Sequence, residues 1–165
     1  MNPAATARLR FRTWRDDDLP LALALFGDGR VTALVGGPFD TAHTTARLAA
    51  DIAMQRDHGY QYWPVFLHDG THVGCCGLKP HSDPVPIELG FYLRPEHWGC
   101  GYAIEASRAV LDLAFGALAA PAVFAGHHPE NAGSRRTLEA LGFRYTHHEL
   151  YPPTGLQHPC YVLER

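Results

Sequence analysis

The segment Ile87–Ala103 constrains the fold of this chain more than any other. Apolar side chains alternate along Ile87–Leu93, which is the period of a β-strand. A turn containing Gly99 and Gly101 follows, and a helix is predicted to begin at Tyr102. The first N–H groups of such a helix lack partners within the helix and lie at the positive end of its dipole, so they can bind an anion. The two glycines, which have no Cβ atom, would let a phosphate approach the backbone. The alternative is a flexible loop before a helix.

Two other phosphate-binding loops do not fit this segment. A Walker loop requires Gly-Lys followed by Ser or Thr, and the chain contains no such tripeptide. A dinucleotide-binding fingerprint requires a third glycine, where this chain has Ile104, and an early position in the first β-α-β unit.

The remaining periodicity predicts one α/β (α+β) domain over residues 1–165, with a mixed, mostly antiparallel sheet. No linker, low-complexity run or internal repeat divides the chain. The expected strands are Leu9–Trp14, Tyr62–Leu67, Thr71–Leu78, Val85–Leu93, Ala122–Ala125, Phe143–Leu150 and Cys160–Leu163. The expected helices are a short one after Asp16–Asp18, one from Asp40 or Thr41 to about His58, Tyr102–Leu118 and Asn131–Leu141.

The composition excludes some classes of partner. Of 165 residues, 14 are Lys or Arg and 17 are Asp or Glu, which gives a net charge of −3. Such a chain has no basic field for a nucleic-acid backbone, so we expect no nucleic-acid partner. The most apolar stretch, Ala109–Ala125, is interrupted by Asp112, Gly116 and Pro121, so we expect no membrane span.

The thiols and the N-terminus indicate a cytoplasmic location. Residues Met1–Arg15 contain no apolar run of the kind that signal peptides have. The four cysteines have no CxxC spacing, which favours reduced thiols over a disulfide framework. They are Cys75, Cys76, Cys100 and Cys160.

The run Trp98–Ala103 resembles the pyrophosphate loop of the GNAT superfamily of acetyl-CoA-dependent N-acetyltransferases, whose signature is Gln/Arg-x-x-Gly-x-Gly/Ala. Trp98 stands at the Gln/Arg position and Ala103 at the last one. This departure, followed by Glu105 and Ala106, is similar to the ribosomal-protein Nα-acetyltransferase branch (RimJ/RimL type). Other segments resemble that branch in the same order, so the resemblance covers nearly the whole chain. They are Leu9–Leu19, Val73–Leu78, Asn131–Ser134 and Leu141–Phe143.

The resemblance implies a GNAT-like fold with helices on both faces of the sheet and a splayed cleft between the fourth and fifth strands for acetyl-CoA. Phe91 and Leu93 would bind the pantetheine amides through their backbone. An N–H near Phe91 or Tyr92 would stabilise the tetrahedral oxyanion. Asn131 and Ser134 would bind the cofactor, and the alternative role of Asn131 is a plain helix cap. The residues implied to hold the pyrophosphate are Trp98, Gly99, Cys100, Gly101, Tyr102 and Ala103.

The implied reaction is direct attack by an amine, either a protein or peptide N-terminus or a small molecule, in a ternary complex. A general base is then needed, because most amines are protonated at pH 7. Glu88 is the first candidate, since it shares a strand face with Gly90 and Tyr92. Glu149 is the second candidate in the resembling branch, and the alternative for Glu88 is a solvated strand-end charge or a structural hydrogen bond. His81 and His97 are weaker candidates.

The leaving thiolate also needs a proton. Many family members use a tyrosine seven residues after the motif asparagine, and this position is Leu138 here. Ser134 is the remaining candidate donor, its alternative being an ordinary helical residue. Since a thiol of pKa near 8.5 leaves readily, a strong acid is dispensable. A non-catalytic acyl-CoA-binding or regulatory module is the alternative function that this substitution suggests.

The 11 histidines invite a metal interpretation, which the spacing does not support. His127-His128 and His147-His148 are adjacent pairs, and neighbours on a strand point to opposite faces. We therefore expect no metal. The expected partners are acetyl-CoA and an amine acceptor, with the chain acting as a monomer or homodimer.

Overall fold

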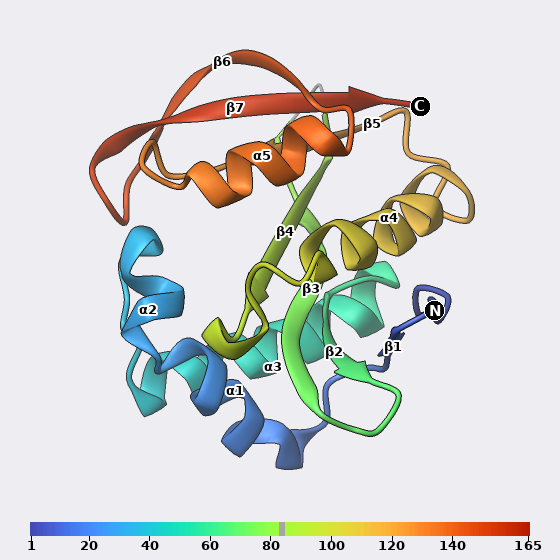
Figure 1. Cartoon of the computed structure of the whole chain (residues 1–165), viewed down its shortest axis with the longest axis vertical. Coiled ribbons are helices and arrows are strands. Elements are labelled where there is room, and N and C mark those ends of the chain that lie inside the picture. Colours follow the sequence, from blue (N-terminus) through green and yellow to red (C-terminus); the bar gives the residue numbers. More distant parts are fainter. Residues whose placement is uncertain (83–84) are drawn as a thin grey trace.

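The computed structural model describes residues 1–82 and 85–165, and these form one seven-stranded mixed sheet with helices on both faces (Figure 1). The strand order is β1-β2-β3-β4-β5-β7-β6. All neighbours pair antiparallel except β4 and β5, which are parallel. The strands are β1 (Leu9–Phe11), β2 (Tyr62–Leu67), β3 (His72–Pro80), β4 (Ile87–Leu93), β5 (Ala122–Gly126), β6 (Arg144–Tyr151) and β7 (Leu156–Glu164).

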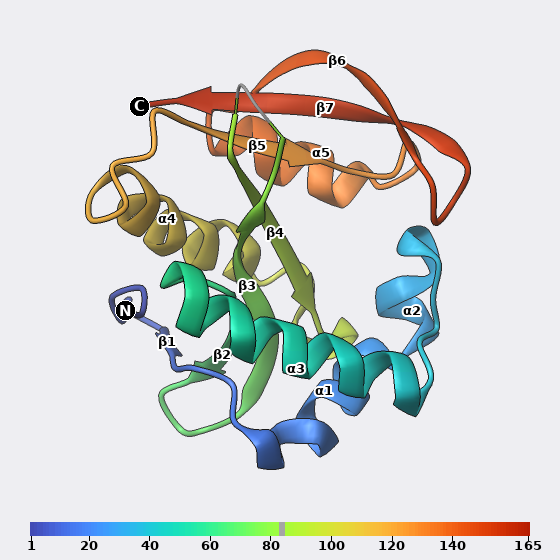
Figure 2. The same ribbon diagram turned by 180° about the vertical axis from the view of Figure 1, so that it is seen from behind.

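The helices cover the two faces of this sheet unequally. Helices α4 and α5 lie on one face, and α1 and α3 cover the β1–β4 half of the other, as the view from behind shows (Figure 2). The α-helices are α1 (Leu19–Phe26), α2 (Gly29–Thr32), α3 (Thr41–His58), α4 (Tyr102–Phe115) and α5 (Ala132–Ala140). The described residues also contain three short 3₁₀ helices: η1 (Asp16–Asp18), η2 (Ala33–Val35) and η3 (Pro95–His97).

Local sequence signals fix the ends of α3. The Asp40 side chain accepts a hydrogen bond from the His43 N–H at the start of the helix, and Gly59 closes it with φ of 78°. A left-handed residue at this position favours glycine, since only glycine adopts it without steric cost. The sequence therefore predicted this helix with its observed bounds.

The hydrophobic core has two parts, one on each face of the sheet. The larger one packs α4 and α5 against β1–β5 and contains Leu89, Val110 and Leu138. The smaller one packs α1 and α3 behind the sheet and contains Phe26 and Tyr62. Alternating β4 side chains enter different parts, with Leu89 in the larger part and Tyr92 packed against the smaller one.

Several predicted bounds differ from the observed ones, including that of β1, which ends at Phe11 rather than Trp14, and one helix was not predicted. Helix α4 ends at Phe115 rather than Leu118, because Gly116 follows it. Strand β7 begins at Leu156 rather than Cys160. The prediction started the strand after Pro159, because proline usually interrupts a strand. The short helix α2 was not predicted, since its four residues are too few to produce a helical period.

No helix within residues 1–82 and 85–165 has the length and apolar character needed to cross a membrane.

Candidate active site

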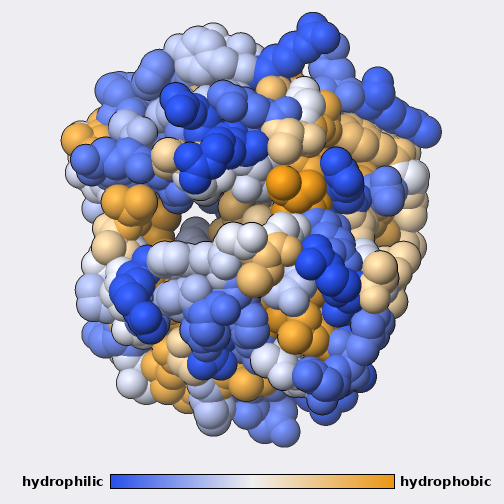
Figure 3. Space-filling model, in the orientation of Figure 1, coloured by the Kyte–Doolittle hydropathy of each residue, from blue (hydrophilic) through white to orange (hydrophobic). Residues whose placement is uncertain are grey.

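The site is an opening between the parallel strands β4 and β5. Within the described residues, the two strands share one registered pair, Glu88 with Phe124, and diverge beyond it. The divergence leaves a cavity of about 830 Å³. The molecular surface in Figure 3 is hollowed near its centre, in the same orientation as Figure 1. The splayed cleft between the fourth and fifth strands is therefore present.

Strand β4 directs backbone groups toward this cavity. The Arg94 N–H donates to the Val73 carbonyl on β3 at 2.9 Å. Because successive residues of a strand direct their backbone groups to opposite edges, those of Phe91 and Leu93 face the side where β5 splays away. Both residues line the cavity, as does Tyr92. The Leu93 carbonyl already accepts the Trp98 indole N–H at 2.8 Å.

The loop after β4 presents its backbone to the same cavity. Gly99 and Gly101 have φ of +73° and +78°, a region that side chains disfavour. A Cβ atom on Gly99 would meet nothing within 4 Å, so the space beside it is open. Gly101 is the N-cap of α4 and has no side chain with which to cap the first N–H groups. These N–H groups and the helix dipole form an anion site.

Five of the six predicted loop residues line the cavity, and Cys100 does not. The five are Trp98, Gly99, Gly101, Tyr102 and Ala103. Cys100 is exposed, and its thiol donates to the Trp98 carbonyl at 3.6 Å. The prediction treated the loop as one unit, whereas a tight turn with two left-handed glycines directs one of its residues outward.

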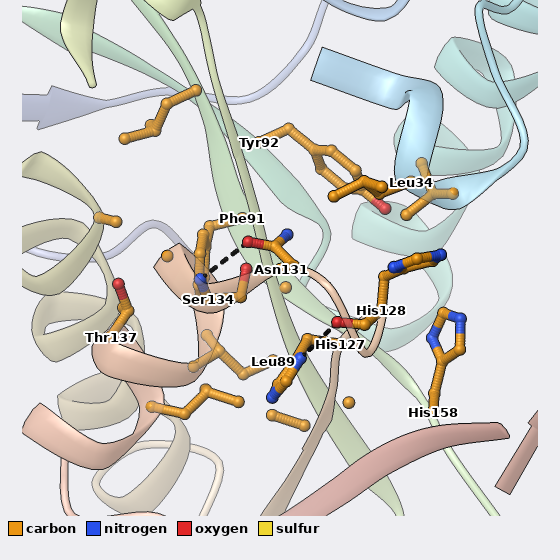
Figure 4. A pocket seen from close by; sticks show the side chains of 18 of the residues that line it. Leu34, Leu89, Phe91, Tyr92, His127, His128, Asn131, Ser134, Thr137 and His158 are labelled. Carbon is orange, nitrogen blue, oxygen red and sulfur yellow. Dashed lines mark hydrogen bonds between the residues drawn. The ribbon is translucent and has the colours of Figure 1, made fainter. Parts of the chain in front are cut away.

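Helix α5 supplies the opposite wall of the cofactor side. The Asn131 Oδ1 accepts the Ser134 N–H at 3.0 Å, so Asn131 is the N-cap of α5. Both residues line the cavity, as Figure 4 shows (Figure 4). The cap uses the amide oxygen of Asn131, which leaves its NH₂ group as the part able to donate to a ligand. The two interpretations of Asn131 are therefore compatible.

Glu88 lies on the face of β4 that also carries Gly90 and Tyr92, and it lines the same cavity. Its carboxylate forms an ion pair with Lys79, directly across the β3–β4 ladder, with Oε2 3.1 Å from Nζ. Burial raises the pKa of Glu88, and the Lys79 ammonium partly opposes this rise. A carboxylate with a raised pKa that lines a cavity is suited to general base catalysis.

Glu149 on β6 lines the same cavity but is more exposed. Its carboxylate accepts a hydrogen bond from His147 Nε2 at 2.8 Å, and 46% of its side chain is accessible. The structure brings Glu88 and Glu149 into one cavity, and the charge of Glu149 contributes to the raised pKa of Glu88.

Three histidines line the cavity and were not selected from the sequence: His127, His128 and His158. Strand alternation does not apply to the first two, because β5 ends at Gly126 and both follow it. Both are buried, and so is His158 on β7. Strand alternation was therefore the wrong reason, although Figure 4 shows the two side chains pointing in different directions. The signal that could have found them is the position directly after a short buried strand.

These histidines are held by specific hydrogen bonds. His127 Nδ1 lies 2.7 Å from the His128 carbonyl, and His128 Nδ1 accepts the Glu130 N–H at 3.1 Å. The second bond places the proton of neutral His128 on Nε2. Burial lowers the pKa of His127 and that of His158, so both are neutral at pH 7. The rings of His128 and His158 lie edge to face, with centroids 5.4 Å apart.

Aromatic side chains form the floor beside Glu88. Tyr62 and Tyr92 line the cavity, with ring centroids 6.1 Å apart. The guanidinium of Arg47 lies beneath them, 5.2 Å and 5.0 Å from the two ring centroids. Burial raises the pKa of Tyr62 well above its usual value, which keeps the phenol protonated.

His147, Glu149 and Cys160 are the described residues with metal-ligand spacing, since their donor atoms lie within 4.8 Å of one another. The first two are exposed, and they already bind each other. Burial raises the pKa of the Cys160 thiol to about 11, which disfavours the thiolate that a metal would need. The expectation of no metal stays a prediction.

Comparisons with known proteins agree with this fold. A family model described as an acetyltransferase (GNAT) domain matches residues 8–144. The uncharacterized protein YkkB of Bacillus subtilis is 30% identical over 145 residues, which cover 86% of this chain and 84% of that protein.

Solved structures share the fold over the whole chain. An acetyltransferase from Agrobacterium tumefaciens has a TM-score of 0.86 and 27% identity, covering 100% of this chain and 95% of that one. The ribosomal L7/L12 α-N-protein acetyltransferase RimL, solved in complex with coenzyme A, has a TM-score of 0.83 and 13% identity. That match covers 99% of this chain and 98% of RimL.

The chain therefore belongs to the GNAT acetyltransferase family. It is an enzyme of the N-acetyltransferase class.

Proposed function

We propose that this enzyme transfers the acetyl group of acetyl-CoA to a primary amine by direct attack in a ternary complex. One observation carries the proposal: a single cavity joins an anion site made of backbone N–H groups to a partly buried carboxylate, Glu88. Acetyl-CoA is the acyl donor of the family, and its pyrophosphate matches the anion site. The carboxylate matches the need of the amine for a base.

The cofactor would lie along the splayed edge of β4. The Trp98–Ala103 loop would bind the pyrophosphate, and the backbone of Phe91 and Leu93 would bind the pantetheine amides. Asn131 lines the same cavity at the start of α5, and its NH₂ group would donate to the cofactor. A backbone N–H near Phe91 or Tyr92 would stabilise the oxyanion.

Glu88 would remove a proton from the ammonium form of the acceptor, directly or through a water. The neutral nitrogen then attacks the thioester carbonyl carbon and forms a C–N bond. Collapse of the tetrahedral adduct breaks the C–S bond and releases the CoA thiolate, while the nitrogen loses its second proton, which would pass to the thiolate directly or through the Ser134 hydroxyl. Glu149 is the second candidate for this base, and its greater exposure makes it the weaker candidate.

The thiolate would be protonated without a tyrosine. Leu138, at the position where many family members have one, is 1% exposed and lines the cavity. Ser134 is the nearest predicted donor, and the thiol leaves readily because its pKa is close to 8.5.

The cysteines support direct attack over a covalent acyl-enzyme. Cys75, Cys76 and Cys160 are buried, and burial raises the pKa of each thiol. Cys100 is exposed but points away from the cavity. None of the four combines access to the cavity with thiolate character.

The acceptor would be a protein or peptide N-terminus, as in the RimJ/RimL-type branch that the motifs resemble, or a small-molecule amine. Its side of the cavity is bounded by Leu34 near α2 and by Leu150 and Tyr151 on β6. We further propose a cytoplasmic monomer or homodimer, without metal, nucleic-acid or membrane partners. The four free thiols are consistent with a reducing compartment.

A free-thiol assay tests the proposal. The protein is incubated with acetyl-CoA and a panel of amines and peptides, and released CoA is followed over time. We expect thiol release that depends on an amine. Tight CoA binding without turnover across the panel would instead favour the non-catalytic acyl-CoA-binding module that Leu138 suggests. If saturating CoA left the melting temperature unchanged, both would be wrong, because a ligand of the native state must stabilise it.

A further inference from the structure

Arg8, just before β1, contacts the loop that follows β4, although 92 residues separate it from Cys100. Its Nη1 donates to the Cys100 carbonyl at 2.9 Å, and its Nε donates to the Glu105 carboxylate at 2.6 Å. The guanidinium carbon also lies 4.6 Å from the centroid of the Tyr102 ring. One side chain therefore contacts the loop and the first turn of α4 at three points.

Glu105 also accepts hydrogen bonds from other groups in the segment Thr6–Arg8. The Thr6 hydroxyl donates to it at 2.6 Å, and the Arg8 backbone N–H donates at 3.0 Å. Partial burial raises the pKa of Glu105, but the hydrogen bonds from Thr6 and Arg8 outweigh this and hold that pKa below its usual value. The carboxylate is therefore ionised at neutral pH. Its negative charge lies in the first turn of α4, close to the place proposed for a pyrophosphate.

The bond to the Cys100 carbonyl orients the next peptide N–H. The Cys100–Gly101 peptide is trans, so its C=O and N–H point in opposite directions. Arg8 holds the carbonyl from outside the main cavity, in a shallow groove that it shares with Glu105 and Arg108. The Gly101 N–H is consequently directed away from Arg8, toward the main cavity that Gly101 lines.

We propose that Arg8 is a positioning residue for the pyrophosphate site: it fixes the Cys100–Gly101 peptide and neutralises Glu105 beside the anion. The inference rests on the proposed function, because it requires that this loop bind the pyrophosphate of CoA. Arg8 does not touch the ligand in this account. Its effect passes through the peptide and through the charge of Glu105.

The test compares binding of CoA with binding of pantetheine, which lacks the pyrophosphate. Titration calorimetry is run on the wild type, Arg8→Gln, Arg8→Lys and the control Arg10→Gln. Arg10 is an exposed arginine on β1 that pairs with Phe66 and does not line the cavity. Thermal unfolding of each variant without ligand shows whether it is folded.

We expect Arg8→Gln to raise the Kd for CoA about 10-fold, in the range for lost hydrogen bonds to charged groups. Arg8→Lys keeps the positive charge but lacks the planar guanidinium, so it should raise the Kd for CoA about threefold. Pantetheine binding should be unchanged in every variant, and Arg10→Gln should match the wild type. The lysine variant keeps the test available if Arg8→Gln fails to fold.

An unchanged Kd for CoA in Arg8→Gln would overturn the inference. Equal weakening of CoA and pantetheine would also overturn it, since Arg8 would then only support the fold. If wild-type protein failed to bind CoA, the proposed function itself would be wrong, and this result is distinct from the other two.

Discussion

The two halves of the cleft are built from different parts of the chain. On the cofactor side, the groups offered to a ligand are mostly backbone N–H and C=O groups of β4 and of the loop at Gly99 and Gly101. On the acceptor side they are side chains, among them Glu88, Tyr92 and His158, which all line the cavity. A backbone site depends on chain conformation, whereas a side-chain site depends on residue identity. The first half should therefore set the affinity for acetyl-CoA, and the second should set the chemistry and the choice of amine.

The largest expected effect comes from Glu88→Gln. Loss of a general base typically costs about 10²–10⁴-fold, and we expect kcat at pH 7 to fall within that range. Because burial raises the pKa of Glu88, the wild-type rate should fall as the pH drops through that raised pKa. The variant should lose this acidic limb and partly recover at high pH, where the free amine is abundant. A complete pH–rate profile checks this, and a profile like that of the wild type would move the base to Glu149 or to water.

Acid unfolding could imitate that limb, and His72 on β3 is its main expected source. Burial lowers the pKa of His72 from 6.5 to about 4. Because the folded-state pKa lies below the unfolded one, its stabilising contribution is complete above pH 6.5 and is lost as the pH falls from 6.5 toward 4. At pH 5 the loss should be about 2 kcal/mol.

Urea unfolding of the wild type and His72→Phe at pH 7 and pH 5 measures this loss. His72 packs between the rings of Trp14 and Phe66, so phenylalanine suits the site. The variant should lose less stability between the two pH values than the wild type. The exposed His68, replaced by Gln, serves as the control. An equal pH dependence in the wild type and His72→Phe would remove His72 as the cause and leave the acidic limb to the active site.

Gly101→Ala tests the cofactor half. Gly101 has φ of 78° and ψ of 5°. An alanine in this left-handed region raises the conformational free energy by roughly 1–2 kcal/mol. Gly59 at the end of α3 has the same φ and ψ but lies outside the cavity, so Gly59→Ala is a matched control for backbone strain. We expect Gly101→Ala to raise the KM for acetyl-CoA about 10-fold, from the same strain acting on the loop. Gly59→Ala should lower only the melting temperature, and an equal KM in both variants would contradict the loop assignment.

Lys79→Met has the smallest expected effect and sharpens the assignment of the base. The Lys79 ammonium, 3.1 Å from Glu88, lowers the pKa of that carboxyl. Its removal should raise the pKa, so the acidic limb of the rate profile should move to higher pH with kcat unchanged on the plateau. A limb that stays in place would mean that Glu88 does not produce it.

The sequence predicted the parts of this site that depend on local signals. The face of Glu88 followed from strand alternation, and the start of α4 at Tyr102 followed from the glycines before it. His127 and His128 were missed because their direction depends on the residue at which β5 ends. The contact between Arg8 and Glu105 joins residues 97 positions apart, and no local pattern encodes such a pairing. Local periodicity thus predicted the placement of β4 and of the loop before α4 better than that of the histidines after β5.

The most direct test of the division between the two halves is a double-mutant cycle on kcat/KM for acetyl-CoA, with Glu88→Gln and Gly101→Ala. From Glu88 to Leu93, β4 extends about 17 Å at roughly 3.3 Å per residue, so the two sites should not share contacts. Effects of sites more than about 10 Å apart usually add within about 0.5 kcal/mol. We predict that the double variant shows the product of the two single-variant fold changes. A coupling larger than about 1 kcal/mol would contradict the account, because loop and base would then act as one unit.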